Sequence, residues 1–251
     1  MLGRLKDKRI IITGAVDNIG KAAVHAFLDE GARVVVGDIN AARGRSVAEE
    51  FGPAVRFLTV DVTDEAAIRA FIDAGVNWLG GLDVLCQNAG VQIVGDVIAY
   101  SVADWDRSFA VNVRAQFLGA KYAIPHLKAS GKGSIVNMAS IAGVKGIPGA
   151  AGYCASKGAV VLMTNSLARE LGKDNIRVNA ICPGWVDTAF NNPYIGYMGG
   201  REAQAEAVKR DVPLGRQCTP EEVAPLYVFL ASDESSFISG QAILVDGGVH
   251  N

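Results

Sequence analysis

The sequence predicts an α/β protein, with a doubly wound sheet of seven parallel strands and helices on both faces. Short, nearly continuous apolar runs alternate with longer runs in which apolar side chains recur at helical spacing. A glycine-rich turn joins the first strand to the first helix, and 29 glycines suit close packing of helices on a sheet. No linker or low-complexity segment interrupts residues 1–251, so we expect one domain.

The first half of the chain contains four expected strands and three expected helices. The strands are short and rich in β-branched residues, and they cover Arg9–Thr13, Arg33–Gly37, Val55–Val60 and Leu82–Gln87. The helices have apolar positions three or four residues apart, and they cover Lys21–Glu30, Ala41–Phe51 and Asp64–Trp78.

The alternation continues to the end of the chain. The expected elements are a long helix at Val102–Leu127, a strand at Gly133–Met138, a helix at Tyr153–Gly172, a strand at Arg177–Ile181, a looser segment at Trp185–Val212, a helix at Pro220–Ala231 and a last strand at Ala242–Val245. Thr219, with Glu222 three residues later, has the pattern of a capping box at the start of the Pro220–Ala231 helix.

Composition argues against several classes of protein. The net charge is −2 with acids and bases mixed throughout, so we expect no nucleic-acid or membrane surface. Near the N-terminus only Ile10–Ile12 is continuously apolar, too short for a signal-peptide core, and we expect a cytoplasmic protein. Four scattered cysteines without a C-x-x-C pair predict no metal or disulfide framework, and Cys86 and Cys182 are expected in the core.

Tyr153 and Lys157 stand four residues apart at the start of an expected helix. Positions i and i+4 lie on one helix face, so a phenol and an ammonium would be neighbours. A nearby positive charge favours the phenolate and would lower the pKa of Tyr153, which suits a general acid or base. Ser140 follows an apolar strand at its carboxyl end, where open α/β sheets bind ligands.

The glycine-rich turn reads T-G-A-V-D-N-I-G at Thr13–Gly20. With Ser140 and the motif Y-C-A-S-K at 153–157, this turn resembles the short-chain dehydrogenase/reductase family, in its compact single-domain branch with a Rossmann-like fold. The resemblance extends from Lys8 to Gly247. It implies hydride transfer between a nicotinamide dinucleotide and a substrate carbon.

The resemblance also implies a role for each of four residues. Tyr153 would be the general acid/base at the substrate oxygen, and Lys157 would lower its pKa and bind the nicotinamide ribose. Ser140 would hydrogen-bond the substrate carbonyl or hydroxyl. Asn112 would hold a proton-relay water, although by itself it also fits an ordinary polar helix residue.

One position of the glycine turn departs from the family's T-G-x-x-x-G-x-G. Gly14 and Gly20 match, but Asn18 stands where the middle glycine is expected. Asparagine is the next best residue for a left-handed backbone, so the turn is expected to persist. The adjacent carboxylate of Asp17 would repel a pyrophosphate, so we expect somewhat weakened dinucleotide affinity.

Asp38 follows the second strand, about twenty residues after the glycine turn, where an acid accepts hydrogen bonds from the adenosine ribose of NAD. Neither Val16 nor Ile39, the places expected for a phosphate-binding base, is basic. We therefore expect a preference for NAD over NADP. The alternative is that Asp38 caps the next helix.

The residues expected to bind the cofactor lie at the carboxyl ends of strands and in the turns that follow. They are Gly14, Asp17, Asn18, Ile19, Gly20, Asp38, Ile39, Asp61, Val62, Asn88, Ala89, Gly90, Tyr153, Lys157, Pro183, Gly184, Val186 and Thr188. In the family, Asp61 and Val62 lie where the adenine is held, and Val186 and Thr188 would hold the nicotinamide carboxamide. Asn88 also fits a purely structural brace.

Substrate specificity is expected in the loops at the carboxyl ends of the strands. The candidate pocket walls are Val91, Ile93, Ile141, Val144, Ile147 and Pro148. The segment 185–212 is a candidate lid, with the large side chains Trp185, Phe190, Tyr194, Tyr197 and Met198. Lys145 and Arg201 are either anion contacts or solvated charges. These walls favour an apolar or ring-shaped substrate, and a hydroxy acid, polyol, steroid or dihydrodiol all remain open.

The sequence therefore predicts an NAD-dependent dehydrogenase or reductase that interconverts a secondary alcohol and a ketone. A 3-oxoacyl-thioester reductase and a non-catalytic dinucleotide-binding sensor are the alternatives. An enoyl reductase would be expected to space its tyrosine and lysine more widely. Family analogy predicts a homotetramer, assembled through the helices 102–127 and 153–172 and through the C-terminal segment 242–251.

Overall fold

The computed structural model describes residues 3–250; Met1, Leu2 and Asn251, which the predicted domain includes, lie outside the described residues. Within residues 3–250, seven strands form one parallel sheet in the order β3-β2-β1-β4-β5-β6-β7. The strands are β1 (Arg9–Thr13), β2 (Arg33–Asp38), β3 (Val55–Thr59), β4 (Val84–Gln87), β5 (Gly133–Met138), β6 (Ile176–Pro183) and β7 (Ala242–Val245). The predicted doubly wound fold is confirmed.

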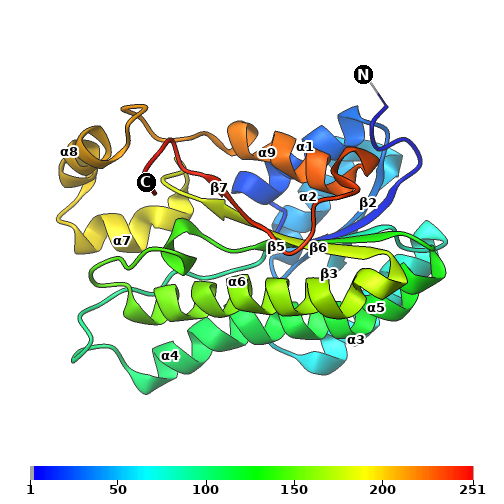
Figure 1. Ribbon diagram of the computed structural model, residues 1–251, viewed down its shortest axis with the longest axis horizontal. Helices are drawn as coiled ribbons and strands as arrows, with labels where there is room; N and C mark the ends of the chain where they lie inside the picture. Colours follow the sequence, from blue (N-terminus) through cyan, green and yellow to red (C-terminus); the bar gives the residue numbers. More distant parts are fainter. Residues whose placement is uncertain (1–2, 251) are drawn as a thin grey trace.

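Helices cover both faces of the sheet (Figure 1). They are α1 (Asn18–Asp29), α2 (Ala41–Phe51), α3 (Glu65–Leu79), α4 (Val102–Phe109), α5 (Ala115–Ala129), α6 (Ala151–Leu171), α7 (Asn192–Tyr197), α8 (Arg201–Asp211) and α9 (Pro220–Ala231). In the view of Figure 1, α1, α2 and α9 lie above the sheet, whereas α3, α5 and α6 lie below it.

The core has two main layers because successive side chains of a strand point to opposite faces. Ile10 and Ile12 of β1 pack into the cluster that contains Phe27 of α1. Ile11, between them, packs into the cluster on the other face, with Phe71 of α3. This two-sided burial explains why the strands are continuously apolar rather than alternating.

Most predicted elements occur with ends within three residues of the prediction. The bounds of β1, α2, β5, α9 and β7 agree with the prediction at both ends. The capping box is also confirmed, because the side chain of Thr219 accepts from the backbone of Glu222 and the Glu222 carboxylate accepts from the Thr219 N–H at 2.9 Å.

Two predicted segments differ from the structure. The expected helix at 102–127 is interrupted by a π turn at Ala110–Arg114, which divides it into α4 and α5. The segment 185–212, expected to be loose, contains α7 and α8, separated by glycines at positive φ, Gly199 and Gly200. The polar α8 has little apolar periodicity, which is why the sequence pattern did not indicate it.

Candidate active site

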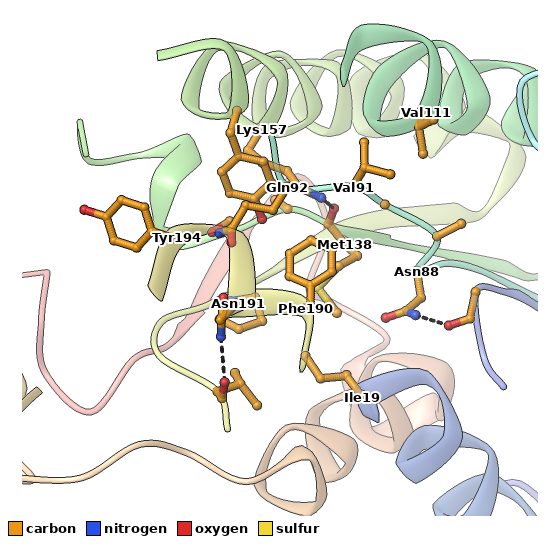
Figure 2. Close-up of a pocket in the computed structure, with 18 of the residues that line it drawn as sticks. Ile19, Asn88, Val91, Gln92, Val111, Met138, Lys157, Phe190, Asn191 and Tyr194 are labelled. Atoms are coloured by element: carbon orange, nitrogen blue, oxygen red, sulfur yellow. Dashed lines mark hydrogen bonds between the residues drawn. The ribbon is translucent and has the colours of Figure 1, made fainter. Parts of the chain in front are cut away.

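A cavity of about 1540 Å³ lies at the carboxyl ends of the strands, lined by the β–α loops and by the segment that carries α7 and α8 (Figure 2). Its volume exceeds the roughly 300–1,000 Å³ typical of a site for one small ligand, so it has room for two ligands together. Of the predicted catalytic and cofactor-binding residues, all line this cavity except Gly20 and Asn112.

The glycine turn lies against the loop that follows β4. Gly14 has φ +67°, and a Cβ on it would lie 2.6 Å from the Cα of Ala89. A Cβ on Gly20 would lie 2.4 Å from the Gly14 carbonyl oxygen, so Gly20 is buried beneath the turn. Asn88 donates from Nδ2 to that carbonyl at 2.5 Å and accepts from the Tyr227 hydroxyl at 3.2 Å. Asn88 is therefore a brace for the turn as well as part of the cavity wall.

The start of α1 fits an anionic group. Asn18 has φ 48°, which confirms the expected left-handed backbone at this position. Asp17 occupies the N-cap position, but its side chain does not cap the first N–H groups of α1. The start of α1 lines the cavity, next to the tightly packed Gly14 and Gly20. Free N–H groups and the positive end of a helix dipole form the arrangement that binds a pyrophosphate. The residues thus fit a dinucleotide.

The carboxylate of Asp17 is not isolated. It forms an ion pair with Arg43 of α2 at 2.5 Å and accepts from Asn18 Nδ2 at 2.9 Å. The guanidinium therefore offsets part of the negative charge that was expected to repel a pyrophosphate. No motif pointed to Arg43, because it comes from the next βα unit.

Asp38 ends β2 and lines the cavity. Its Oδ1 accepts from the backbone N–H of Asn40 at 2.9 Å, and Asn40 itself caps α2 through Arg43 N–H. The alternative that Asp38 caps α2 is therefore wrong. Burial raises the pKa of the Asp38 carboxyl, because the ionised form loses solvation; the backbone N–H of Asn40 acts in the opposite direction.

Asp61 lies on the same side of the cavity, in the turn after β3. Its Oδ1 accepts from the backbone N–H and the hydroxyl of Thr63, both at 2.8 Å. These hydrogen bonds hold the pKa of Asp61 below its usual value. An ionised, oriented carboxylate thus occupies the position expected beside the adenine.

Tyr153 and Lys157 come together on α6, as predicted, and both are buried, with 5% and 1% of their surface exposed. Lys157 Nζ lies 5.7 Å from the centroid of the Tyr153 ring and donates to the Met138 carbonyl oxygen at 2.8 Å (Figure 2). Burial lowers the pKa of Lys157 to about 8.

The pKa of Tyr153 is raised in this structure, and the prediction that Lys157 lowers it stays a prediction. Burial of the phenol raises its pKa above the ordinary value, because the phenolate would lose its solvation. A hydrogen bond with Ser140 acts in the opposite direction but does not outweigh burial. The Lys157 ammonium hydrogen-bonds to Met138 instead of the phenol oxygen. The structure therefore favours a protonated Tyr153.

Asn112 sits in the π turn and is fully buried. Its Oδ1 accepts from Val91 N–H at 2.8 Å, and its Nδ2 donates to the Val91 carbonyl and to the Ser156 hydroxyl, each at 3.0 Å. Ser156 in turn donates to the Tyr153 carbonyl at 2.8 Å. Asn112 thus connects the loop after β4 to α6 from behind the cavity wall.

Comparison with known proteins agrees with this geometry. A family model described as enoyl-(acyl carrier protein) reductase matches residues 14–250. A 3-alpha-(or 20-beta)-hydroxysteroid dehydrogenase of Mycobacterium tuberculosis is 40% identical over 251 residues, covering 99% of this chain and 91% of that protein. The chain belongs to the short-chain dehydrogenase/reductase family.

Two further relatives of this short-chain dehydrogenase/reductase are similar along almost their whole length. Meso-2,3-butanediol dehydrogenase of Serratia marcescens is 40% identical over 247 residues, covering 98% of this chain and 95% of that protein. A 3-oxoacyl-(acyl-carrier-protein) reductase of Thermotoga maritima is 39% identical over 249 residues, covering 98% and 99%. The chain is an oxidoreductase of a family that uses a nicotinamide dinucleotide.

The substrate end of the cavity agrees only in part with the predicted walls. The predicted side chains that line it are Val91, Ile141, Lys145, Ile147, Pro148, Trp185, Phe190, Tyr194 and Met198. Ile93, Val144, Tyr197 and Arg201 do not. Tyr197 instead donates to Asp96 at 2.7 Å, and Arg201 bonds to Gln204 and Asn192.

Several residues at this end of the short-chain dehydrogenase/reductase cavity were not predicted. They are Gln92, Met163, Asn191, Ala207, Arg210, Asp211 and Val249. Arg210 and Asp211 form an ion pair with each other at 2.8 Å, so together they add little net charge to the wall. The position of Gln92, two residues beyond the N-A-G motif, was the one available signal.

The described part of the chain also bears on metals and membranes. Within residues 3–250, no three His, Cys, Asp or Glu side chains are close enough together to hold a metal ion. No helix in that range is long and apolar enough to span a bilayer. Cys86 and Cys182 are fully buried, as predicted for core residues.

Proposed function

We propose that this short-chain dehydrogenase/reductase uses NAD to interconvert a secondary alcohol and a ketone. One observation carries the proposal: Ser140, Tyr153 and Lys157 line a single cavity whose other end contains the glycine turn and Asp38. Hydride donor, proton donor and substrate would therefore meet in one enclosed space.

The cofactor would extend along the carboxyl edge of the sheet. Its pyrophosphate would lie at the start of α1, and Asp38 would accept hydrogen bonds from the adenosine ribose. Asp61 and Val62 would border the adenine, and the loop after β6 would hold the nicotinamide. When bound, NAD supplies the hydride acceptor and NADH the hydride donor.

The protein's own contribution is the proton and its position. During reduction, Tyr153 donates its phenolic O–H to the carbonyl oxygen and becomes the phenolate; during oxidation, the phenolate takes the proton from the hydroxyl. The raised pKa of Tyr153 favours the protonated form that reduction needs. Ser140 hydrogen-bonds the same oxygen and orients it. Lys157, held by Met138, would also bind the nicotinamide ribose. Asn112 is proposed as a positioning residue that fixes Val91 and α6, with any relay water lying nearby.

The preference for NAD rests on Asp38. Its partly buried carboxylate would be close to the 2′-phosphate of NADP and would repel it. The Arg43 guanidinium, a candidate for a phosphate contact, is already paired with Asp17.

The substrate is proposed to be a small secondary alcohol or its ketone with a largely apolar body, enclosed by a lid at 185–212. Apolar and aromatic walls support this, as do the names of the hydroxysteroid and butanediol dehydrogenase relatives. A 3-oxoacyl-thioester reductase is the second candidate, favoured by the Thermotoga maritima relative. The enoyl reaction named by the family model is disfavoured by the four-residue spacing of Tyr153 and Lys157.

We further propose a single-domain, cytoplasmic homotetramer. Large apolar side chains are exposed on the helices predicted to meet their copies: Val102, Trp105, Phe117 and Leu162. A monomer leaves these side chains in water, whereas packing against a second copy would bury them.

The test is NADH formation from NAD with secondary alcohols, including diols, hydroxysteroids, aryl carbinols and hydroxyacyl thioesters. Tyr153→Phe removes only the phenolic hydroxyl, so turnover is expected to fall at least about a hundredfold while NAD binding persists. Undiminished turnover in this variant would contradict the assigned proton transfer. Tight NAD binding with no turnover of any alcohol or ketone would favour the sensor alternative.

A further inference from the structure

An amide oxygen on the cavity wall has no hydrogen-bond partner in the protein. Among the described residues, four buried side-chain polar atoms lack such a partner: Gln92 Oε1, Gln116 Oε1, Asp174 Oδ2 and Arg177 Nη1. Only Gln92 lines the large cavity.

The other three atoms have explanations within the fold. Asp174 forms an ion pair with Lys128 at 2.8 Å. Arg177 donates from its other terminal nitrogen to the Leu230 and Ser232 carbonyls. Gln116 borders a void of about 10 Å³, close to the volume needed for one water. Gln92 is thus the one of these four residues that borders a space large enough for a ligand, and a small rotation of its side chain would turn Oε1 into that space.

The backbone that carries Gln92 is held firmly. The side chain of Asn112 bonds to both the N–H and the carbonyl of Val91, the preceding residue. Two residues before Gln92, a Cβ on Gly90 would lie 3.6 Å from Lys157 Nζ. Since consecutive Cα atoms are about 3.8 Å apart, Gln92 starts within about 8 Å of the Gly90 Cα.

Figure 2 shows the Gln92 side chain pointing toward the part of the pocket where Tyr194 and Asn191 lie. The large side chains there are mainly apolar or aromatic, including Phe190, Tyr194 and Met198. The side chain of Asn191 is held by one hydrogen bond, in which its Nδ2 donates to the Val186 carbonyl at 2.6 Å. Gln92 therefore provides a hydrogen-bond acceptor in a mainly apolar part of the cavity.

We propose that Gln92 is a specificity-determining residue that accepts a hydrogen bond from a second polar group of the substrate. The substrate would then be a hydroxyketone and its diol, or a ketone that carries an amide N–H in place of the hydroxyl. The donor group would lie one or two carbons from the reacting carbon. This inference rests on the proposed function. A substrate analogue without the donor would leave the buried Gln92 oxygen without a hydrogen bond. The enzyme should therefore discriminate against that analogue.

The test compares 3-hydroxybutan-2-one with 3-methoxybutan-2-one, and 2-hydroxycyclohexanone with 2-methoxycyclohexanone, in NADH-dependent reduction. Each methyl ether keeps the oxygen but cannot donate. For the wild-type enzyme we expect kcat/KM to favour at least one hydroxyketone over its ether by about tenfold or more.

Three variants identify the group responsible. Gln92→Met has similar length but no acceptor oxygen, and should lose the preference. Gln92→Glu keeps a carboxyl oxygen that accepts in either protonation state, and should retain it. Ile93→Met is the matched control in the same loop, because Ile93 does not line the cavity; its preference should equal that of the wild type.

A binding measurement separates this inference from the proposed reaction. Calorimetric titration of the same ketones into Tyr153→Phe enzyme loaded with NADH reports affinity without turnover. Tighter binding of the hydroxyketone, lost in the Gln92→Met/Tyr153→Phe double variant, supports the role of Gln92. Equal affinities, or no binding of either member of both pairs, overturn it. Reduction of both members at equal rates overturns the inference while leaving the alcohol–ketone reaction intact.

Discussion

Replacing Gly14 by alanine tests whether the glycine turn needs its close approach to the neighbouring loop. Gly14 has φ +67°, and an added Cβ would lie 2.6 Å from the Cα of Ala89 and 2.7 Å from its N. Both are backbone atoms, so relief requires the loop after β4 to move. That loop begins with Asn88, which bonds to the Gly14 carbonyl.

The expected loss of stability has two parts. A left-handed backbone costs an alanine about 1–2 kcal/mol relative to glycine. Forcing a methyl into a closed site costs about 1–3 kcal/mol more, so Gly14→Ala should lower the free energy of unfolding by about 2–5 kcal/mol in total. Gly80 provides the matched control, because it has a left-handed backbone with φ +77° and no atom within 4 Å of the added Cβ. Gly80→Ala should therefore lose only the first part.

The assay is urea unfolding at one fixed protein concentration, with the midpoint and slope recorded for wild type and both variants. Calorimetry with NAD gives the accompanying affinity, which should fall for Gly14→Ala and stay constant for Gly80→Ala. Equal losses of stability in the two variants would refute the reasoning, since they would show that contact with Ala89 contributes nothing beyond backbone conformation.

Three other predictions concern the cofactor and the buried lysine. Asn18→Gly relieves a non-glycine residue at φ 48° and should tighten NAD binding in calorimetry; unchanged affinity would contradict a weakened turn. Asp38→Ser removes the carboxylate and should raise NADP affinity relative to NAD by about tenfold in a paired titration, whereas a constant ratio would count against its role. The folded-state pKa of Lys157, about 8, lies below its ordinary 10.5, so the unfolded chain binds more protons between these values and stability should rise with pH there. Lys157→Met should flatten that rise in urea midpoints measured between about pH 8 and 10, and an identical slope in both proteins would refute the assignment.

The fold could be predicted from the sequence because its strands are buried on both faces. Ile10 and Ile12 face the layer with α1, and Ile11 faces the layer with α3, so all three positions are buried and apolar. The backbone at Asn18 was also predictable, since its place in a glycine pattern demanded a left-handed conformation. Local chemistry was sufficient in both cases.

The site could be predicted in composition but not in electrostatics. The i, i+4 rule brought Tyr153 and Lys157 together, yet the pKa of Tyr153 depends on how deeply the assembled loops bury it. Arg43 was missed because only the folded turn brings it to Asp17. Gln92 was missed because a glutamine in a loop belongs to no motif. What decides its significance is the absence of a partner within the described residues, which is a tertiary property.

The π turn at Ala110–Arg114 also sets the rotational phase between α4 and α5. Trp105 and Phe117, both exposed, are twelve positions apart. At about 100° per residue, an uninterrupted α-helix would place them about 120° apart around its axis. A π turn takes up one residue more than an α turn, which removes about 100° and brings the two rings to within about 20°. Deleting one residue here would keep the two rings about 20° apart, because eleven α-helical residues turn through the same angle. Rewinding the same twelve residues as a regular α-helix, without a deletion, would instead rotate Trp105 by about 100° relative to Phe117. The π turn that carries the buried Asn112 therefore also aligns the exposed apolar side chains of α4 and α5.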